Sequence, residues 1–551
     1  NGNQLAITDG AGVEIRGPGA ELLTIDANRQ SRVLYIATDA EASIDGVTFT
    51  NGLTPDYGGG IYNHGVLELI DVDILANEAG IGGGGIWSND TVNLTGATIV
   101  GNSADNGGGI HNWGSASVTD STIDDNAAIQ GGGILNENYA SLSVGNSSVS
   151  NNTAARGAAA YNDVGGELSI DGSALSDNSA TDDGGAVYNA GSLLSLLDST
   201  ISRNSAGDNG GALFTIAGTT TVTASLIANN VATDFGGGVF SSGTVSITIS
   251  TIAGNVADLG GGVYVNLGST TAWNSIIAEN YAPASPNLHG SLQSESDYNL
   301  VDVDPGFVRA PSAGADGIWG NTDDDKGDLH LRSTSVAINQ GSSVVVPDAE
   351  AISVETDLDG KPRIIYDVVD IGVYEFALVA DANYDATVDQ GDSQVLASHW
   401  GMTGMTWNEG DFDLDGIVGP KDAALLGANW GATFTPPVSG SQPIADTGLA
   451  ACPTLVGPLQ ANGPIAARRP LEPVIRKSLL SHKQPASVLE SLPAAHDAAL
   501  VEAFDPVAEQ TVPQRLAWSF AMSRGSGDSE QDKLLDLHDA ALDELLLNDV
   551  S

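Results

Sequence analysis

Gly58-Gly59-Gly60-Ile61-Tyr62-Asn63 is the stretch that decides the fold, because the chain repeats it. Later glycine clusters begin at Gly83, Gly107, Gly131, Gly184, Gly210, Gly236 and Gly260, with a degraded copy at Gly157-Ala158-Ala159-Ala160. Each repeat also holds an Ile/Val-rich segment closed by asparagine, at Asn51, Asn77, Asn102, Asn126, Asn152, Asn178, Asn204, Asn230, Asn255 and Asn280. Neighbouring asparagines lie 24 to 26 residues apart, and so regular a period predicts a repeat architecture.

Each repeat is too short and too polar to bury a core of its own. Its apolar residues alternate with polar ones in short runs, such as Val66-Leu67-Glu68-Leu69-Ile70 and Thr244-Val245-Ser246-Ile247-Thr248-Ile249, which is the pattern of β-strands. Three short strands and three bends use about 25 residues, the length of one coil of a right-handed parallel β-helix. Coils stacked at about 4.8 Å would join their apolar residues into one continuous core.

We therefore predict a mainly β fold, with a parallel β-helix and its closing segment over residues 1–376. Residues 1–50 would form the opening coils, and the coils would continue to about Asn280. A helical solenoid is excluded, because the repeats contain glycine clusters and no apolar stripe of period 3.6.

The recurring glycines and asparagines predict structural bends. Glycine fits where the backbone turns sharply and adjacent coils leave no room for a Cβ atom. Asparagine tolerates the left-handed conformation, and its amide can donate to the carbonyl oxygen of the next asparagine along the stack. We expect a structural asparagine ladder at this bend.

The glycine clusters are paired with the pattern Thr-Ile-x-x-Asn-x-Ala, as in 98–104, 200–206 and 251–257. This pairing resembles the repeats of polymorphic outer-membrane proteins and related right-handed β-helix surface proteins, over roughly residues 45–285. The resemblance implies a cell-surface β-helix. It implies no particular chemistry, because the same scaffold serves adhesins, lyases and inert stalks.

Charge and composition limit the classes of partner that the chain can bind and the place where it acts. The 551 residues carry a formal net charge of −51, which excludes ordinary nucleic-acid binding because phosphate contacts need Lys and Arg. Such a surface attracts divalent cations. The single cysteine, Cys452, excludes an intrachain disulfide, and no segment is apolar enough to span a membrane. No signal peptide is present, so we expect a missing N-terminal region, and the architecture indicates an extracellular or cell-surface protein.

Aspartates recur two residues before the glycine clusters, at Asp56, Asp105, Asp182, Asp208, Asp234 and Asp258. The last four would stack about 5 Å apart, where like charges repel by about 1 kcal/mol. They are either solvent-facing bend residues or a string of weak Ca²⁺ sites. The acidic loop from Asp316 to Asp325 is likewise either pinned by Ca²⁺ or solvated.

The end of the β-helix is expected between residues 328 and 375. Segments 328–331 and 337–339 have the pattern of final coils. Segment 357–363, Asp-Leu-Asp-Gly-Lys-Pro-Arg, and segment 370–375 resemble the closing segment of many secreted bacterial β-helix proteins. A cap is expected because an open end exposes unpaired strand edges.

The strongest site signal lies in residues 377–435, where two loops carry oxygen ligands at the spacing of a Ca²⁺-binding loop. Positions 1, 3, 5, 7, 9 and 12 of the first loop are Asp381, Asn383, Asp385, Thr387, Asp389 and Asp392. Thirty residues later, positions 1, 3, 5, 7 and 12 of the second loop are Asp411, Asp413, Asp415, Ile417 and Asp422. Position 7 supplies a backbone carbonyl, so its side chain is free to vary. We predict Ca²⁺ in both loops, each followed by a helix, at 393–401 and 423–431, with His399 as a packing residue.

Two tandem loop–helix units with Asp at position 12 resemble a dockerin, the module that docks an enzyme or surface protein onto a cohesin. The resemblance implies a cohesin-like partner. Ala386 stands at position 6, where glycine is usual, so that turn should be strained. Gln390-Gly391 and Pro420-Lys421 replace the small hydroxyl residues of the best-known cohesin binders. This departure affects the expected cohesin partner and leaves the expected metal binding unchanged.

Residues 436–551 form a Pro/Ala/Leu-rich tail, which we expect to be mostly disordered. From Asp532 to Leu547 its leucines and alanines lie on one helical face, which predicts a terminal amphipathic helix, either docking or frayed.

Two functions fit these features. The first is a secreted or cell-surface adhesion or structural protein, non-catalytic, which contacts an extracellular polysaccharide and docks through its calcium module. The alternative is a polysaccharide lyase or glycoside hydrolase that carries a dockerin.

A lyase needs a base, and the only two basic residues between Val33 and Val308, Arg156 and Arg203 (the coil arginines), stand at different coil positions. Arg203 is expected to pair with Asp177 one coil earlier. A glycosidase needs two carboxylates about 5 to 9 Å apart, a spacing that any acidic ladder provides. With no aromatic-lined cleft expected, the sequence favours the non-enzyme and assigns no catalytic residue.

Overall fold

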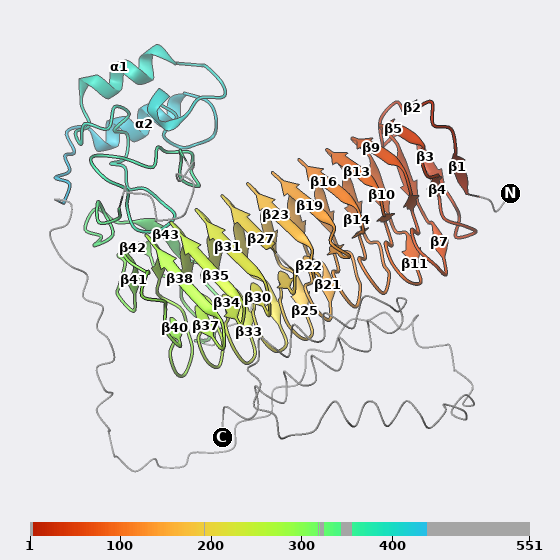
Figure 1. The fold of residues 1–551 in the computed structure, drawn as a ribbon. Helices are drawn as coiled ribbons and strands as arrows, with labels where there is room; N and C mark the ends of the chain where they lie inside the picture. Colours follow the sequence, from red (N-terminus) through yellow and green to blue (C-terminus); the bar gives the residue numbers. More distant parts are fainter. Residues whose placement is uncertain (1–3, 192, 318, 320–323, 343–354, 438–551) are drawn as a thin grey trace, which may run out of the picture. The chain divides into compact units, whose positions relative to one another are not determined.

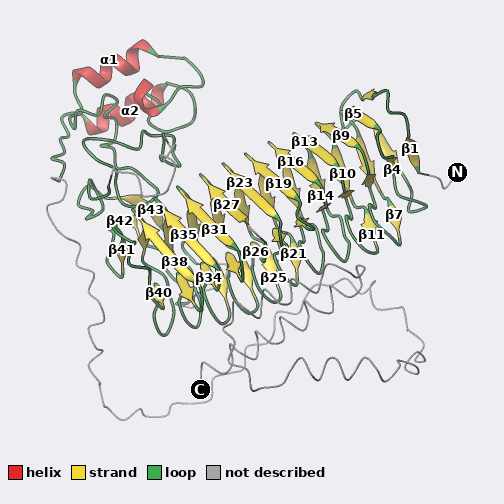
Figure 2. Cartoon of the chain, in the orientation of Figure 1, coloured by secondary structure: helices red, strands yellow, loops and turns green. Residues whose placement is uncertain are grey.

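The computed structural model describes residues 4–191, 193–317, 319, 324–342 and 355–437. Up to residue 301 the chain winds into a right-handed parallel β-solenoid, in which the coils supply strands to three long sheets (Figure 1). Strands dominate and helices are few (Figure 2). The predicted tail beyond residue 437, with its terminal helix, lies outside the described residues.

Sheet A has 12 parallel strands, which follow the glycine clusters: β1 (Leu5–Ile7), β4 (Leu34–Ile36), β8 (Ile61–Asn63), β12 (Ile86–Ser88), β15 (Ile110–Asn112), β18 (Ile134–Asn136), β22 (Ala160–Asn162), β26 (Val187–Asn189), β30 (Leu213–Thr215), β34 (Val239–Ser241), β37 (Val263–Val265) and β40 (Leu288–His289). Sheet B has 11 strands: β2 (Val13–Arg16), β5 (Glu41–Asp45), β9 (Val66–Ile70), β13 (Thr91–Thr95), β16 (Ser115–Thr119), β19 (Ser141–Gly145), β23 (Glu167–Asp171), β27 (Leu193–Leu197), β31 (Thr219–Thr223), β35 (Thr244–Thr248) and β38 (Ser269–Trp273).

Sheet C has 12 strands: β3 (Thr24–Asp26), β6 (Thr48–Thr50), β10 (Asp73–Leu75), β14 (Thr98–Val100), β17 (Thr122–Asp124), β20 (Ser148–Ser150), β24 (Ala174–Ser176), β28 (Thr200–Ser202), β32 (Leu226–Ala228), β36 (Thr251–Ala253), β39 (Ile276–Ile277) and β41 (Leu300–Val301). A fourth, short side pairs β7 (Leu53–Thr54) with β11 (Glu78–Ala79), and β21 (Thr153–Ala154), β25 (Ser179–Ala180), β29 (Ser205–Ala206) and β33 (Val231–Ala232) in order.

Residues that repeat in the sequence pair in space, as the period predicts. In sheet A, Ile86 pairs with Ile61 of the preceding coil and with Ile110 of the following one. In sheet B, Leu94 pairs with Leu69. All five belong to one buried cluster that runs through the solenoid. Each coil therefore completes the core of its neighbours, and burial at about 25 cal/mol per Å² drives the stacking.

The glycine clusters confirm that neighbouring coils approach too closely for a Cβ atom. Gly83 has a φ of +65°, and a Cβ on Gly84 would lie 2.5 Å from the carbonyl oxygen of Gly108 in the next coil. A side chain at Gly84 would therefore push two coils apart.

The asparagine ladder is confirmed from Asn77 to Asn280. The amide nitrogen Nδ2 of Asn77 donates to Oδ1 of Asn102 at 3.0 Å, and the same bond recurs up to Asn255 and Asn280 at 2.9 Å. Each Oδ1 also accepts from the backbone N–H of the preceding asparagine, as at Asn102 and Asn77, 3.0 Å. These buried side chains satisfy one another.

Two parts of the asparagine prediction are wrong. Asn51 is not in the ladder, because Gly52 occupies that register and donates its N–H to Oδ1 of Asn77 at 2.8 Å. The left-handed residue is also not the ladder asparagine. It is the residue before it, as at Ala76 (φ +54°) and Arg203 (φ +59°), so the ladder asparagine is free to turn its amide inward.

The segments expected as final coils differ from the prediction. Sheets A and C continue past Asn280 to β40 and β41, and β43 (Asp328–Leu331) then pairs antiparallel with β42 (Phe307–Arg309). Segment 337–339 contains no strand. Both segments instead join a second buried cluster that packs on outward residues of sheet C such as Ala228, Ala253 and Ile276.

Buried carboxylates hold this closing segment, 355–376, in place. Asp357 accepts backbone N–H groups of Asp359, Lys361 and Glu375, and Asp370 accepts those of Asn339 and Phe376, all at 2.7 to 2.9 Å. Val373 donates its N–H to Oγ1 of Thr251 in β36 at 3.0 Å. The segment thus lies against the side of sheet C and is fastened there by charge-assisted hydrogen bonds.

Candidate metal centre

The predicted calcium module, residues 377–435, consists of two similar loop–helix units and is called the calcium module below. Its helices are α1 (Gln390–Ser398) and α2 (Pro420–Asn429), with a short 3₁₀ helix η1 (Trp407–Glu409) before the second loop. A buried cluster that includes Val388, Leu396, Trp407, Val418 and Leu426 joins them. None of the helices among the described residues is both long and apolar enough to cross a membrane.

Backbone pairing shows that the two units are related by a shift of 30 residues. Val388 of the first loop accepts from Gly431 N and donates to Ala432 O, both at 2.9 Å. Thirty residues later, Val418 accepts from Gly401 N at 2.8 Å and donates to Met402 O at 3.2 Å. Each loop is therefore held by the segment that follows the other unit's helix.

Both helices begin three residues earlier than predicted, at Gln390 and Pro420. Asp389 caps α1 by accepting the N–H of Gly391 at 2.7 Å, and Pro420 opens α2 with a preset φ. Loop positions 10 to 12 therefore already lie in the first helical turn.

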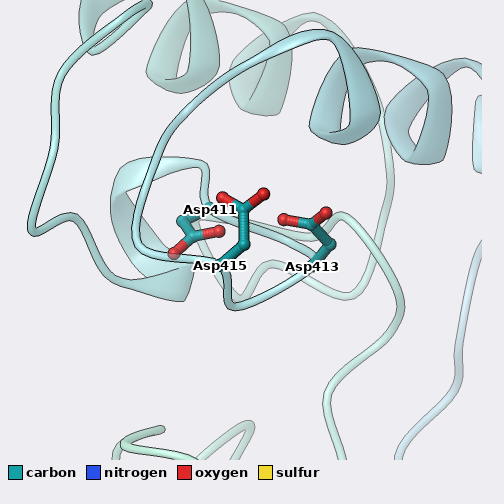
Figure 3. Close-up of side chains that lie close together, drawn as sticks. All are labelled: Asp411, Asp413 and Asp415. Carbon is teal, nitrogen blue, oxygen red and sulfur yellow. The ribbon is translucent and has the colours of Figure 1, made fainter.

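Three carboxylates of the second loop converge (Figure 3). One oxygen atom from each of Asp411, Asp413 and Asp415 lies within 4.8 Å of the others. Asp411 is buried, and its Oδ1 and the Oδ1 of Asp413 are buried atoms with no hydrogen-bond partner among the described residues. Burial, with the charges of Asp422 and Asp413, raises the pKa of Asp411. Such an arrangement favours a cation.

The remaining residues of the second loop are consistent with this site. Both oxygens of buried Asp422 face the loop backbone: Oδ1 accepts from Phe412 N at 2.7 Å and Oδ2 from Gly419 N at 2.7 Å. Ile417, at position 7, is 46% exposed, so its side chain takes no part in the loop interior. Gly416 has the positive φ of +80° that position 6 requires.

Lys421 brings a positive charge to the edge of the second loop. Its Nζ lies 3.0 Å from Oδ2 of Asp413 and 2.8 Å from Oδ2 of Asp415. These contacts raise the pKa of Lys421 and lower that of Asp415. The ammonium group partly neutralises the acidic loop and leaves Asp411 uncompensated.

The first loop has the same backbone but a looser set of side chains. Asp381 and Asp392 are fully buried, and Asp392 accepts the N–H groups of Ala382 and Asp389 at 2.8 Å. Asn383 and Asp385 are exposed and lie 3.0 Å apart. Ala386 takes a φ of +66°, so the predicted strain at position 6 is confirmed.

Two further predicted ligands of the first loop are engaged locally. Thr387 donates its N–H to Oδ1 of Asp385 at 2.9 Å, and the Asp389 carboxylate is the cap of α1. His399 lies at the end of α1, where Nδ1 is 3.0 Å from the carbonyl oxygen of Val395, as expected for a packing residue.

The first loop is hydrogen-bonded to the closing segment of the solenoid. Tyr366 donates its hydroxyl to Oδ2 of Asp381 at 3.1 Å and accepts the N–H of Leu378 at 2.9 Å. Trp407 donates Nε1–H to the carbonyl oxygen of Asp381 at 3.2 Å, and Lys361 lies 5.0 Å above its ring. Asp381, the predicted first ligand of the loop, thus accepts a hydrogen bond from the closing segment through one of its carboxylate oxygens.

The aspartate ladder is stacked as predicted but faces solvent. Asp208 N donates to Asp182 O, Asp234 N to Asp208 O and Asp258 N to Asp234 O, at 2.9 to 3.0 Å. Asp208, Asp234 and Asp258 are exposed. Among the described residues, no three ladder carboxylates gather within 4.8 Å of one another. The acidic loop from Asp316 to Asp325 lies partly outside the described residues.

The coil arginines Arg156 and Arg203 both have partners. Arg203 forms the predicted ion pair with Asp177, at 2.5 and 2.7 Å, and its hydrogen bonds lower the pKa of that carboxyl. The guanidinium of Arg156 lies 6.0 Å from the ring centroid of Tyr188. Burial raises the pKa of neighbouring Asp183 to about 7, while Asn209 donates to it at 2.9 Å. Neither arginine is presented as a base.

Two aromatic features were missed in the sequence. The middle residues of five sheet A strands point away from the solenoid core and stack on one another, so that their rings are buried. The ring centroids lie 4.7 to 5.4 Å apart, and the residues are Tyr161, Tyr188, Phe214, Phe240 and Tyr264. The signal was the aromatic residue that recurs after an aliphatic residue (Ala, Val or Leu) in these copies. On sheet B, Trp273 lines a groove with Glu295, although no aromatic-lined cleft was expected.

Comparisons with known proteins show no family for this chain. No family model and no curated protein matches the sequence. A crystal structure of pectate lyase Pel9A aligns with 68% of this chain and 98% of its own, at 13% sequence identity and a TM-score of 0.35. The comparisons establish no family for this chain, which is a parallel β-solenoid by its own strand pairing.

Proposed function

We propose that this chain is a non-catalytic adhesion or structural protein of the cell surface or extracellular space. Its β-solenoid contacts an extracellular polysaccharide, and its dockerin-like module binds Ca²⁺ and docks a partner protein of the cohesin kind. The solenoid is the scaffold, and the module is the attachment point.

One observation carries the calcium part of the proposal. Asp411, Asp413 and Asp415 converge within 4.8 Å, and two of their buried oxygens have no hydrogen-bond partner in the described part of the chain. Uncompensated buried carboxylates are costly, and Ca²⁺ with its oxygen ligands at 2.3 to 2.6 Å would relieve that cost. The equivalent first loop, 30 residues earlier, supplies a second ion site.

The non-catalytic part rests on the coils. Both coil arginines contact other side chains, and the aspartate ladder is spread along the surface. A lyase base or a converging acid pair is therefore not favoured over a binding role.

Thermal unfolding tests the calcium part. We expect Ca²⁺ to raise the unfolding temperature of the module relative to EGTA, and the double substitution Asp411→Asn with Asp413→Asn to reduce that rise. Asp367→Asn, which removes an exposed carboxylate outside both loops, should leave it unchanged. An equal rise in all three proteins would contradict the assignment.

Incubation with polysaccharides tests the non-catalytic part. The purified chain, with Ca²⁺, is mixed with neutral and acidic glycans, and new reducing or unsaturated ends are measured beside sedimentation of the protein. Sedimentation without new ends is the expected result. Accumulation of new ends would make the chain a polysaccharide-degrading enzyme.

A further inference from the structure

The outward face of sheet B carries a groove that the calcium module does not use. The groove encloses about 230 Å³ near the last strands of the sheet. Ser246 and Thr248 of β35 and Thr271 and Trp273 of β38 line it, together with Glu295 of the following loop. The Trp273 ring is braced from one side by Tyr298, with the centroids 5.4 Å apart and the planes at 54°. An aromatic wall, three hydroxyls and one carboxylate therefore meet here.

The indole N–H of Trp273 is an unmet donor. Nε1 is buried and has no hydrogen-bond partner among the described residues. A buried donor without a partner is costly, so a small shift of the ring that let Nε1 reach a ligand oxygen would be favoured.

A straight column of hydroxyls leads away from the groove. Ser195, Thr221, Ser246 and Thr271 pair in register on four successive strands. The column continues in register through Ser169, Ser143 and Ser117. The strand spacing sets these hydroxyls about 4.8 Å apart. Within the described residues, only Thr221 of the seven uses its hydroxyl in a hydrogen bond, with Leu194 O at 3.4 Å.

Near the groove the face around this column lacks charge, although the net charge of the chain is −51 and Glu167 and Asp171 flank Ser169 further along the column, on β23. No outward position on β27, β31, β35 or β38 is ionisable: they are Leu193, Ser195, Leu197, Thr219, Thr221, Thr223, Thr244, Ser246, Thr248, Ser269, Thr271 and Trp273. A polyuronate or sulfated glycan would find no cation here and would meet the repulsion of the acidic surface.

Uncharged sugars match this chemistry. Each serine or threonine hydroxyl both donates and accepts, as sugar hydroxyls do. The apolar face of a sugar ring can pack on an indole, which offers a large flat apolar surface with one polar N–H group. Glu295 adds an acceptor for sugar hydroxyls at the edge of the groove.

We propose that this face of sheet B binds one chain of an uncharged polysaccharide, with a sugar ring packed against Trp273 and the chain lying along the hydroxyl column. This inference rests on the proposed glycan-contacting function and adds to it a location and a ligand class. Calcium takes no part in it.

Co-sedimentation of the full chain tests the inference. The particles are cellulose, insoluble xylan and insoluble β-1,3-glucan as neutral polymers, with calcium-free polygalacturonate gel as the anionic one, all in EGTA. We expect binding to at least one neutral polymer. Trp273→Ala should weaken it about tenfold, and Thr248→Val, which keeps the shape and removes the hydroxyl, about threefold.

Trp400→Ala is the matched control, because Trp400 is a half-exposed tryptophan of the calcium module and should leave binding unchanged. Circular dichroism checks that each variant is folded. Neutral binding that survives both groove substitutions would overturn the groove and leave the glycan-contacting function standing. A preference for polygalacturonate would overturn the ligand class. Absence of binding to every polymer would overturn the inference and the glycan part of the proposed function together.

Discussion

Single residues of the second loop tune its cation site. Lys421 places an ammonium group 3.0 Å from Asp413 and 2.8 Å from Asp415, where it competes with a bound cation. Exposed ion pairs are weak because water screens them. Lys421→Met should therefore tighten Ca²⁺ binding to this loop by up to about fivefold. A Ca²⁺ titration in an Asp381→Asn background, where the first loop is disabled, measures it.

Lys326→Met provides the control, because it removes the same charge from an exposed position outside the module. Equal tightening in both variants would mean that general electrostatics, and not competition at the loop, sets the affinity.

The buried asparagines hold the coils together one hydrogen bond at a time. Asn152 accepts from the N–H and Nδ2 of Asn126 and donates to Ile123 O and Asn178 Oδ1, all at 3.0 Å. Asn152→Ala leaves several buried groups unpaired and should cost about 3 kcal/mol. Its exposed neighbour Asn151 has a φ of +53°, so Asn151→Gly should change the unfolding free energy by less than about 0.5 kcal/mol. Urea denaturation compares them, and similar losses would contradict the ladder.

His330 makes the closing segment sensitive to pH. Both ring nitrogens face carboxylates, Nδ1 at 2.6 Å from Asp328 and Nε2 at 2.9 Å from Asp359, which requires the imidazolium form. Burial lowers the pKa of His330, but the bonds and charges of Asp359 and Asp328 outweigh it and raise the pKa above 6.5. The stabilisation is therefore complete below pH 6.5 and is lost as the pH rises through the raised pKa.

Because the His330 side chain is 43% exposed, its contribution stays below about 1 kcal/mol. Unfolding free energies of the native chain and of His330→Gln, measured from about pH 5 to about pH 9, should differ most at the acid end. A difference that grows toward alkaline pH would show that the neutral ring is the stabilising form.

At the scale of elements, residues of the closing segment contact residues of the calcium module. Tyr366 of the closing segment hydrogen-bonds to Asp381, the first ligand of the first loop, and its ring lies 5.4 Å from Phe434. We expect Ca²⁺ to slow amide exchange in the closing segment as well as in the module, because the occupied loop fixes Asp381 and so Tyr366.

Tyr366→Phe should confine the effect of Ca²⁺ on hydrogen exchange to the module. Tyr384→Phe is the matched control, because its hydroxyl is buried and has no hydrogen-bond partner in the described part of the chain. If Ca²⁺ protects the closing segment equally in both variants, the coupling does not pass through Tyr366.

Elements also show what could be predicted from the sequence. Strands and core followed from the period, since each coil packs on a copy of itself. Asn51 was misplaced by one residue because a 26-residue step hides which residue takes the extra position, and only the register of Gly52 with the ladder resolves it. The antiparallel pairing of β43 was missed because its alternating pattern fits either direction.

In the candidate sites too, contacts between residues close in sequence could be predicted, and contacts that depend on tertiary packing could not. The ligand spacing predicted the two loop–helix units, because their residues are close in sequence, and Ca²⁺ in them stays a prediction. Lys421 beside Asp413 also follows from local spacing, but the contact of Tyr366 with Asp381 depends on tertiary packing. The groove at Trp273 was missed because Glu295 and Tyr298 come from a segment outside the repeat.

At the scale of the whole molecule, the acidic composition is compatible with the fold because repetition stabilises the coils without many ion pairs. Nineteen basic residues face 70 acidic ones, so the coils are held mainly by apolar stacking and amide ladders, with few ion pairs such as Arg203–Asp177 in the described part of the chain. Self-repulsion is the cost of this composition, and bound cations reduce it. We propose that those cations bind in the two loops of the module and that sugars bind on the uncharged part of sheet B, over β27, β31, β35 and β38.

The most direct test is isothermal titration calorimetry of Ca²⁺ into the full chain. The account predicts saturation at two ions per chain, one for each loop of the module, with one ion lost on Asp381→Asn and the other on Asp411→Asn. Absence of binding heat, or a stoichiometry that both substitutions leave unchanged, would contradict the calcium module at the centre of the account.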